Sequence, residues 1–383
     1  MTGSTGLRVE VDEQYERFRL AARGWLDANV PADLGDAETD DGFARHRRWE
    51  QRLLEAGYSG ISWPTEFGGV GGDLLHEAIF TEEYERAEAP KRITRPSLRF
   101  IGPTIMRFGT SAQQERWLAR MLRADDIWSQ GFSEPDAGSD LAAIRTRADL
   151  HDGTYLVTGQ KTWNTYGRFS DWLFALVRTG KADGRHRGLT CLAIDMHSPG
   201  IEVRPIRQVH GRSGFAEVFL DGVMVPAENR IGDHDDGWAV AMRLLSFERG
   251  ADTGGPLRTE RRLAALAGDV ARDLSHGRAE DAARELGSAY AALLAYRAYT
   301  YRQLTSQWLG DEPGQVSSSI KLFSSRLDTE LVDLGVELFG DERMVEGSPE
   351  YLDFWHSRAS RIYGGTAEIQ HNIVADRVLR LPR

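Results

Sequence analysis

The segment Phe132-Ser133-Glu134-Pro135-Asp136-Ala137-Gly138-Ser139-Asp140 separates a helical first third of the chain from a strand-rich middle third. Gly138 and Ser139 leave backbone N–H groups and a hydroxyl uncovered, which suits the close approach of a phosphorylated or planar polar ligand. Ordinary loops share this composition, so the segment alone leaves both interpretations open. Two further segments bear on the choice: Gly159-Gln160-Lys161-Thr162-Trp163-Asn164-Thr165 and Tyr363-Gly364-Gly365-Thr366-Ala367-Glu368-Ile369.

Length and composition indicate a globular protein of two or three packed units. The chain has 383 residues, of which 41% are hydrophobic and 27% charged, and its apolar runs are shorter than the roughly 18 residues of a membrane span. The formal net charge of -11 argues against a nucleic-acid partner. The single cysteine, Cys191, is expected to be buried. Residues 1–9 lack the basic and apolar parts of a secretory signal, so we expect a cytoplasmic protein without a membrane span.

The order of elements is helices, strands, helices. Apolar residues recur at helical spacing from Val11 to Arg123, with Ser111-Ala112-Gln113-Gln114 predicted as a capping box and the glycine-rich stretch Trp63–Gly72 as a loop. Short β-branched and aromatic runs then predict a compact antiparallel β domain. The predicted strands are Tyr155 to Thr158, Trp172 to Val177, Leu189 to Asp195, Ile201 to Pro205 and Ala216 to Leu220.

Helical spacing returns after Gly237, and alanine-rich stretches favour the close packing of a four-helix bundle. The predicted helices are Ala239 to Ser246, Arg258 to Leu274, Ala282 to Leu309, Val316 to Leu338 and Thr366 to Val378, with turns at Pro313-Gly314 and Gly347-Ser348-Pro349. We therefore expect an α+β fold with an N-terminal helical domain at residues 1–125, a central β domain at 126–235 and a C-terminal helical domain at 236–383.

Together the three segments resemble the acyl-CoA dehydrogenase family. Glu134 to Asp140 matches Glu-Pro-x-Ala-Gly-Ser-Asp in full, and Gly159 to Trp163 matches Gly-x-Lys-x-Trp at the family's distance. Trp63 to Gly69 matches the family's Trp-Pro-x-Glu-x-Gly-Gly, and the order of domains agrees. The resemblance covers nearly the whole chain. It implies an FAD-dependent oxidation of an acyl-CoA thioester to a 2-enoyl-CoA, with electrons passed to an electron-transferring flavoprotein.

The resemblance also assigns roles near the flavin. In the family, the aromatic residue of Lys-x-Trp-x-Thr packs against the ring and the hydroxyl residue bonds to N5, which implies Trp163 and Thr165 here. Ser133 and Ser139 match positions that touch the flavin and the thioester region. Asn164 and Tyr166 depart from the usual pattern, which has an aliphatic residue and an asparagine. The implied cofactor-binding residues are Phe132, Ser133, Gly138, Ser139, Trp163, Thr165, Thr366 and Glu368.

The catalytic base is expected at an uncommon position. Removal of the weakly acidic α proton requires a carboxylate over the α carbon. Many family members keep it in Tyr-Glu-Gly-Thr, but here Tyr363 is followed by Gly364. In the isovaleryl and long-chain branches the base belongs to a Glu-Arg pair on a helix, which implies Glu248, followed by Arg249. The apolar run before Glu248 should raise its pKa toward ~6 to 7. The alternative is an exposed helix carboxylate paired with an arginine.

The same loop is expected to bind substrate. In the family, the backbone N–H at the position of Gly364 polarises the thioester oxygen, and that contact needs no side chain. The glycine also leaves space for a branched, ring-bearing or otherwise bulky acyl group. The implied substrate-binding residues are Ser139, Arg249, Tyr363 and Gly364.

Two family motifs are missing, and both serve a neighbouring subunit. Arg-x-x-Phe-Gly is absent near Asp269 to Arg284, and Glu337-Leu338-Phe339-Gly340-Asp341 stands where Gln-x-x-Gly-Gly is usual. A heterotetramer with a related subunit and a homo-oligomer (dimer or tetramer) both remain open. Alternative functions are dehydrogenation of a carrier-protein-bound acyl group, a non-catalytic half-site subunit, and an oxygen-consuming oxidase.

Overall fold

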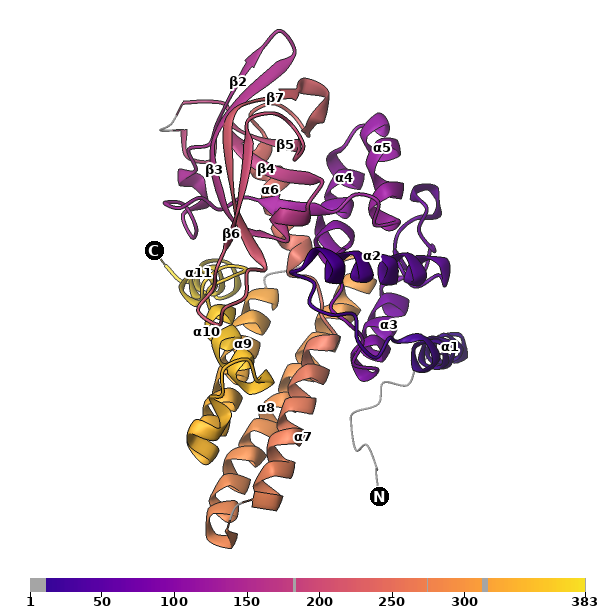
Figure 1. The fold of residues 1–383 in the computed structure, drawn as a ribbon, viewed down its shortest axis with the longest axis vertical. Helices are drawn as coiled ribbons and strands as arrows, with labels where there is room; N and C mark the ends of the chain where they lie inside the picture. Colours follow the sequence, from indigo (N-terminus) through magenta and orange to yellow (C-terminus); the bar gives the residue numbers. More distant parts are fainter. Residues whose placement is uncertain (1–11, 182–183, 274, 312–315, 383) are drawn as a thin grey trace.

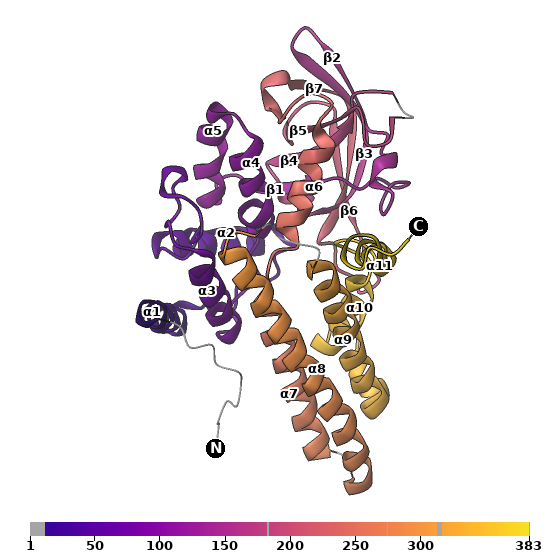
Figure 2. The ribbon, with the colours of Figure 1, turned by 180° about the vertical axis from the view of Figure 1, so that it is seen from behind.

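The computed structural model describes residues 12–181, 184–273, 275–311 and 316–382. It has three parts: the N-terminal helices lie to one side, a β domain forms one end, and long C-terminal helices extend from the other (Figure 1). Turned by 180°, the structure shows the helix α6 (Gly237–Glu248) in front of the sheet, where it contacts two strands (Figure 2). The predicted α+β class and the order of helices, strands and helices are confirmed.

The N-terminal part packs its helices around an aromatic core that includes Trp49, Phe80 and Tyr84. Trp63, predicted to lie in a loop, is buried between this part and the β domain and donates a hydrogen bond from its indole to the Leu98 carbonyl at 3.0 Å. The helices are α1 (Glu13–Asn29), α2 (Asp40–Glu55), α3 (Leu74–Arg86), α4 (Gly102–Phe108) and α5 (Ser111–Leu122), with a π-helical turn at Ser97–Ile101 before α4.

The capping box of α5 lies one residue earlier than predicted. Thr110 has an extended backbone, and its hydroxyl accepts a hydrogen bond from the Gln113 N–H at 3.3 Å. The Gln113 side-chain oxygen accepts one from the Thr110 N–H at 2.9 Å, which completes the box. The predicted box at Ser111 and Gln114 is therefore wrong. Gln114 instead donates its side-chain amide to the Met106 carbonyl at 2.9 Å.

The β domain is one eight-stranded sheet in the order β6-β7-β3-β2-β4-β5-β8, with β1 paired to β4. Most pairs are antiparallel as predicted, but β4 pairs in parallel with β1 and β2. β4 is buried throughout because its two faces belong to different hydrophobic cores. The strands are β1 (Trp128–Gly131), β2 (Arg147–His151), β3 (Thr154–Thr165), β4 (Trp172–Arg178), β5 (Leu189–Asp195), β6 (Ile201–Ile206), β7 (Phe215–Pro226) and β8 (Arg230–Ile231).

The C-terminal part contains one helix that the sequence pattern did not predict. Ser348 caps it by accepting a hydrogen bond from the Tyr351 N–H at 3.1 Å, and Pro349 opens its first turn, where a missing N–H costs nothing. The predicted turn at Pro313-Gly314 lies outside the described residues. Besides α6, the helices are α7 (Gly254–Asp273), α8 (His276–Trp308), α9 (Val316–Phe339), α10 (Pro349–Ser360) and α11 (Ala367–Ile373), which continues into a π turn at Val374–Val378.

Cys191 is buried, as predicted. It lies in β5, and its thiol donates to the Gly237 carbonyl at 3.5 Å. None of the helices in those ranges combines the length and the apolar character that a bilayer span requires.

Candidate active site

Trp163 leaves the sheet at a β-bulge. Between the pairs Lys161 with Val218 and Asn164 with Ala216, β3 advances by one residue more than β7. Trp163 lies in this bulge with a φ of 62°. Its side chain is 55% exposed, and its ring is 5.9 Å from that of Phe215. The bulge therefore presents an open indole face, which fits the planar ring of the flavin that the sequence predicts.

Asn164 has a structural use that accounts for its departure from the family pattern. It is buried, and its side-chain amide donates to the Gln130 carbonyl at 2.7 Å. The bond ties β3 to β1 directly beside the bulge, so the unusual residue holds the strand that carries Trp163.

Lys161 and Glu134 join the two motifs through a buried ion pair. The Lys161 ammonium donates to the Glu134 carboxylate at 2.7 Å and to the carbonyls of Leu176 at 2.6 Å and Phe132 at 3.3 Å. The other carboxylate contacts are the N–H groups of Arg145 at 2.6 Å and Thr146 at 2.9 Å. Burial alone would raise the pKa of Glu134, but the Lys161 charge holds it below its usual value. The loop that ends in Ser139 is thereby fixed beside Trp163.

The third segment is a loop of two glycines with left-handed backbone. Gly364 has a φ of 65° and Gly365 a φ of 93°, conformations that cost a residue with a side chain about 1 to 2 kcal/mol. The Gln370 side-chain amide donates to the carbonyls of Gly364 at 3.0 Å and Gly365 at 3.4 Å, which holds the loop against α11. In both views α11 lies at the end of the β domain where β6 points (Figures 1 and 2).

The carboxyl group of Glu248 lies directly in front of this loop. A Cβ atom built on Gly364 would be 3.7 Å from Glu248 Oε1. Glu248 is the last residue of α6 and is half-buried, so it is not the exposed helix carboxylate of the alternative interpretation. A helix thus delivers a carboxylate oxygen to the space that a side chain at position 364 would enter.

The turn that follows Glu248 is fastened from two sides. The Arg99 guanidinium donates to the carbonyls of Gly250 at 3.1 Å and Ala251 at 2.7 Å. The Gln303 side chain donates to the carbonyl of Arg249 at 3.0 Å. These bonds hold the backbone at the end of α6, which carries Glu248.

The surroundings of Glu248 favour a proton acceptor. Burial raises the pKa of the Glu248 carboxyl above its usual range, while the positive charges of Arg249, Arg95 and Lys321 oppose that rise. Lys321 lies on α9, where its ammonium donates to the Ser360 carbonyl at 2.5 Å. Burial lowers the pKa of Lys321 to about 8. The site therefore combines a carboxylate of raised pKa with cations that favour its ionised form.

The remaining predicted residues are placed as follows. Ser133 and Thr165 are half-buried, and Gly138 and Ser139 are exposed at the tip of their loop.

Arg249 is half-buried beside Glu248, and Tyr363 is 47% exposed with Lys321 Nζ 4.4 Å from its ring centre. Thr366 caps α11 by accepting from the Ile369 N–H at 3.3 Å, and Glu368 is exposed in the first turn.

Phe132 is placed differently from the other predicted cofactor residues. Its side chain is buried in the core with its ring 6.2 Å from that of Phe174, so only its backbone is available to a ligand.

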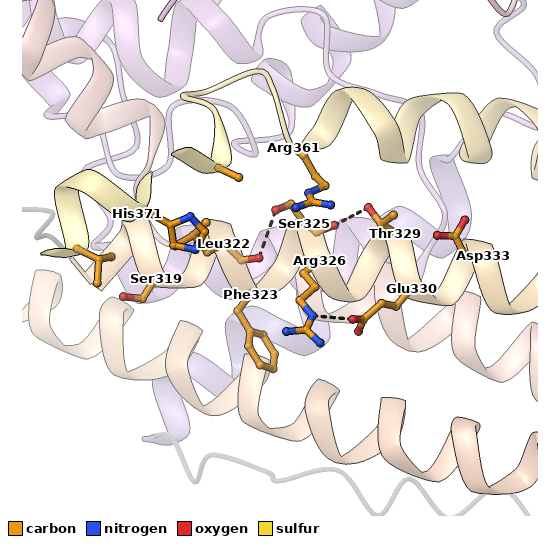
Figure 3. A pocket seen from close by; sticks show the side chains of 12 residues that line it. Ser319, Leu322, Phe323, Ser325, Arg326, Thr329, Glu330, Asp333, Arg361 and His371 are labelled. Carbon is orange, nitrogen blue, oxygen red and sulfur yellow. Dashed lines mark hydrogen bonds and ion pairs between the residues drawn. The ribbon is translucent and has the colours of Figure 1, made fainter. Parts of the chain in front are cut away.

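A hollow of about 640 Å³ lies elsewhere, between the outer face of α9 and the segment from Arg361 to α11 (Figure 3). Neither the predicted base Glu248 nor the predicted flavin contact Trp163 lines it. Ala367 and His371 do line it, next to the predicted cofactor residues Thr366 and Glu368. Within the described ranges, no group of three or more His, Cys, Asp or Glu side chains is placed to hold a metal ion.

Two cations whose charges act on Glu248 were not predicted from the sequence. Lys321 lies in a helix whose spacing predicted only packing, and its proximity arises from the fold. Arg95 belongs to the series Arg92, Arg95 and Arg99 in a short segment before α4. The three arginines are visible in the sequence, but their nearness to Glu248 is not, because it arises from packing between distant segments.

Three family models match the chain along its length: acyl-CoA dehydrogenase, N-terminal domain, at residues 12–125; the middle domain at 129–223; and the C-terminal domain at 235–379. Among curated proteins, the acyl-CoA dehydrogenase IpdE1 of Mycobacterium tuberculosis is 37% identical over 384 residues, covering 97% of this chain and 99% of that protein.

Solved structures agree with this result. A chain of the ChsE4-ChsE5 complex from Mycobacterium tuberculosis superposes with a TM-score of 0.84 at 26% identity, covering 98% of this chain and 100% of that one. An acyl-CoA dehydrogenase from Geobacillus kaustophilus gives a TM-score of 0.85 at 23% identity, covering 97% and 100%, which shows the likeness of fold.

Proposed function

The chain belongs to the acyl-CoA dehydrogenase family and is an oxidoreductase acting on acyl-CoA thioesters, and we propose that Glu248 is its catalytic base. One observation carries the assignment: Glu248 Oε1 lies 3.7 Å from where a Cβ on Gly364 would be. Position 364 is where many relatives place the base, so the helix supplies from the opposite side an oxygen that the loop lacks. The raised pKa of Glu248 supports the same role.

The reaction divides between two segments of this chain. Glu248 accepts the α proton, and the Gly364 N–H donates a hydrogen bond to the thioester oxygen as negative charge develops there. Arg249, Arg95 and Lys321 favour the ionised form of Glu248 before the proton arrives. When bound, FAD supplies the acceptor for the hydride that leaves the β carbon.

Family members are FAD flavoproteins, and the residues present fit that cofactor. We propose that the open face of Trp163 packs on the isoalloxazine and that Thr165 and Ser133 donate hydroxyl hydrogen bonds at its edge. Thr366 and Glu368 would meet the remainder of FAD beside α11. Phe132 would contribute only backbone, because its side chain is in the core.

The oligomeric assembly and the electron acceptor are also proposals. The two missing motifs both serve a neighbouring subunit, and the structural relatives include the ChsE4-ChsE5 complex. We propose a heteromer with a related subunit that completes the FAD site, with an electron-transferring flavoprotein as acceptor. Expression of this chain alone tests the idea, because a homo-oligomer with stoichiometric FAD in its visible spectrum would contradict it.

Substitution of the base gives the decisive experiment for Glu248. Glu248→Gln should keep FAD but slow anaerobic flavin bleaching by acyl-CoA esters about 10²- to 10⁴-fold, the usual contribution of a positioned base. Glu202→Gln, which changes an exposed carboxylate of β6, is the matched control and should bleach at the unsubstituted rate. Full bleaching in Glu248→Gln would refute the assignment.

A further inference from the structure

We propose that Gln370 is a positioning residue for the reaction: its side-chain amide holds the glycine loop so that the Gly364 N–H is directed at the thioester oxygen. The inference rests on the role proposed for the Gly364 N–H and names the side chain that supports it. Gln370 acts through the backbone of the loop and does not itself bind the substrate.

The two glycine carbonyls of the loop are bound by one side chain. Gln370 Nε2 donates to the carbonyl oxygen of Gly364 at 3.0 Å and to that of Gly365 at 3.4 Å. Gln370 is fully buried in α11, so water does not compete for these bonds. Within the described part of the chain, the N–H groups of Gly364 and Gly365 have no recorded protein acceptor. The loop therefore has its acceptors filled and its donors available, which suits the binding of a carbonyl oxygen.

The backbone is also held on the other side of Gly364. The N–H groups of Ile362 and Tyr363 both donate to the Ala359 carbonyl, at 2.8 and 3.1 Å, which fastens the start of the loop to the end of α10. Gly364 thus lies between one segment fastened by this turn and another fastened by Gln370. Because glycine has the greatest backbone freedom of any residue, the direction of its N–H depends on both fastenings.

Gly365 is the residue that leaves room for the amide. A Cβ atom on Gly365 would overlap Gln370 Nε2, whereas one on Gly364 would lie 3.7 Å from Glu248 Oε1, an ordinary contact distance. The two glycines therefore serve different groups: the first lies in front of the base, and the second admits the amide that holds the loop. A side chain at position 365 would push the amide away from both carbonyls.

The oxygen of the Gln370 amide argues against a role in packing alone. Gln370 Oε1 is buried and has no hydrogen-bond partner among the described residues. A buried acceptor without a partner destabilises a fold, and an apolar side chain of similar size would avoid that loss. The two bonds of the amide nitrogen account for a polar side chain at this position. A second explanation is that these bonds only stabilise α11, in which case their loss would leave the bound thioester unchanged.

The test uses the FAD-loaded enzyme, with its partner subunit if one is required, and the best substrate among butyryl-, octanoyl-, isovaleryl- and 3-cyclohexylpropionyl-CoA. Gln370→Met keeps the length of the side chain but removes the donor. It should lower kcat about 10- to 100-fold and change KM less than about threefold, because a donor to the developing negative charge is misplaced.

Gln114→Met is the matched control. The Gln114 amide also donates to backbone carbonyls, those of Met106 at 2.9 Å and Gly109 at 3.2 Å, and it belongs to α5, which lies apart from α11 in both views (Figures 1 and 2). The control therefore loses a similar set of bonds away from the glycine loop. It should retain the unsubstituted kcat.

The vibration of the thioester carbonyl gives a readout that a purely structural role would not move. The 2-enoyl-CoA product, labelled with carbon-13 at that carbonyl, binds the oxidised enzyme without further oxidation, and a hydrogen bond to the oxygen lowers its stretching frequency. Isotope-edited infrared difference spectra should show this lowering in the unsubstituted enzyme and in Gln114→Met. In Gln370→Met the lowering should be less than about half as large.

Gly365→Ala tests the same contact from the loop and decides the matter if Gln370→Met does not fold. The added methyl group should displace the amide, lower kcat and reduce the carbonyl shift. Gly364→Ala, which also has a left-handed φ, should retain more of both. A full carbonyl shift in Gln370→Met or Gly365→Ala, with or without a lower kcat, would overturn the inference alone. If no thioester bleaches the unsubstituted enzyme, or if its carbonyl shift is absent, the proposed function and this inference fail together.

Discussion

Two enclosed groups of charges in this molecule are arranged in opposite ways. Around Lys161 and Glu134, every recorded contact is 3.3 Å or less: the ammonium has three acceptors, and the carboxylate also receives two backbone N–H groups. Around Glu248, the charges are spread over several elements, and the Arg95 contact to Asp252 is 3.8 Å long. The first group is paired through short contacts, and the second is not.

The difference separates a supporting role from a reacting one. A saturated buried pair holds the loop that ends in Ser139 against β3, and no group remains to engage a substrate. In the second group, burial raises the pKa of Glu248, and the recorded contact between Arg95 and Asp252 is long. Enclosed charge alone does not indicate function, whereas enclosed charge with incomplete pairing does.

The largest expected effect comes from breaking the buried ion pair between Lys161 and Glu134. Lys161→Met should lower the free energy of unfolding by about 3 to 5 kcal/mol and release FAD, because Glu134 is left charged and buried. Denaturant unfolding and the visible spectrum measure both changes. The double variant Lys161→Met with Glu134→Gln should lose less than the sum of the single losses. Arg95→Met, from the incomplete group, should change stability by less than about 0.5 kcal/mol. Similar losses for Lys161→Met and Arg95→Met would break the comparison.

A smaller effect is expected from Lys321. Glu248 must be ionised to accept a proton, so activity falls as pH drops through its pKa. Because the Lys321 charge opposes the rise of that pKa, Lys321→Met should raise the pKa of Glu248 further and move the acid limb of kcat/KM to higher pH. Activity on the acid side should fall about tenfold, the effect of one pH unit, with little change on the plateau. Lys321→Arg keeps the charge and serves as the control, and an unmoved limb in Lys321→Met would contradict the role.

The smallest effect is expected at the glycine loop. Gly364→Ala should cost about 1 to 2 kcal/mol of stability, because the φ of 65° is left-handed. The added Cβ would meet Glu248 Oε1 at an ordinary contact distance of 3.7 Å, so the base should keep its place. The Tm should fall while the pH of the acid limb stays constant. Gly268→Ala, at an open helical position of α7, is the control and should not be destabilised.

The sequence predicted most of the architecture because helices and strands here follow local periodicity. It placed the cap of α5 one residue late because Thr110 and Ser111 are both good caps, and only the backbone decides between them. It missed α10 because Ser348-Pro349 is equally typical of a turn and of a helix start. The proposed base could be predicted from the combination of a glycine at position 364 and a glutamate at 248. Arg95 and Lys321 could not, because their nearness to Glu248 is created by packing between distant segments.

The glycine loop has one consequence beyond this enzyme. In the proposed mechanism, proton removal depends on a helix and thioester binding on a loop, so the two requirements are carried by separate stretches of the gene. Selection for a larger or differently shaped acyl group can alter the loop while the acid–base chemistry is retained by the helix. This separation offers a simple route by which one ancestral oxidation diversifies over many carbon skeletons.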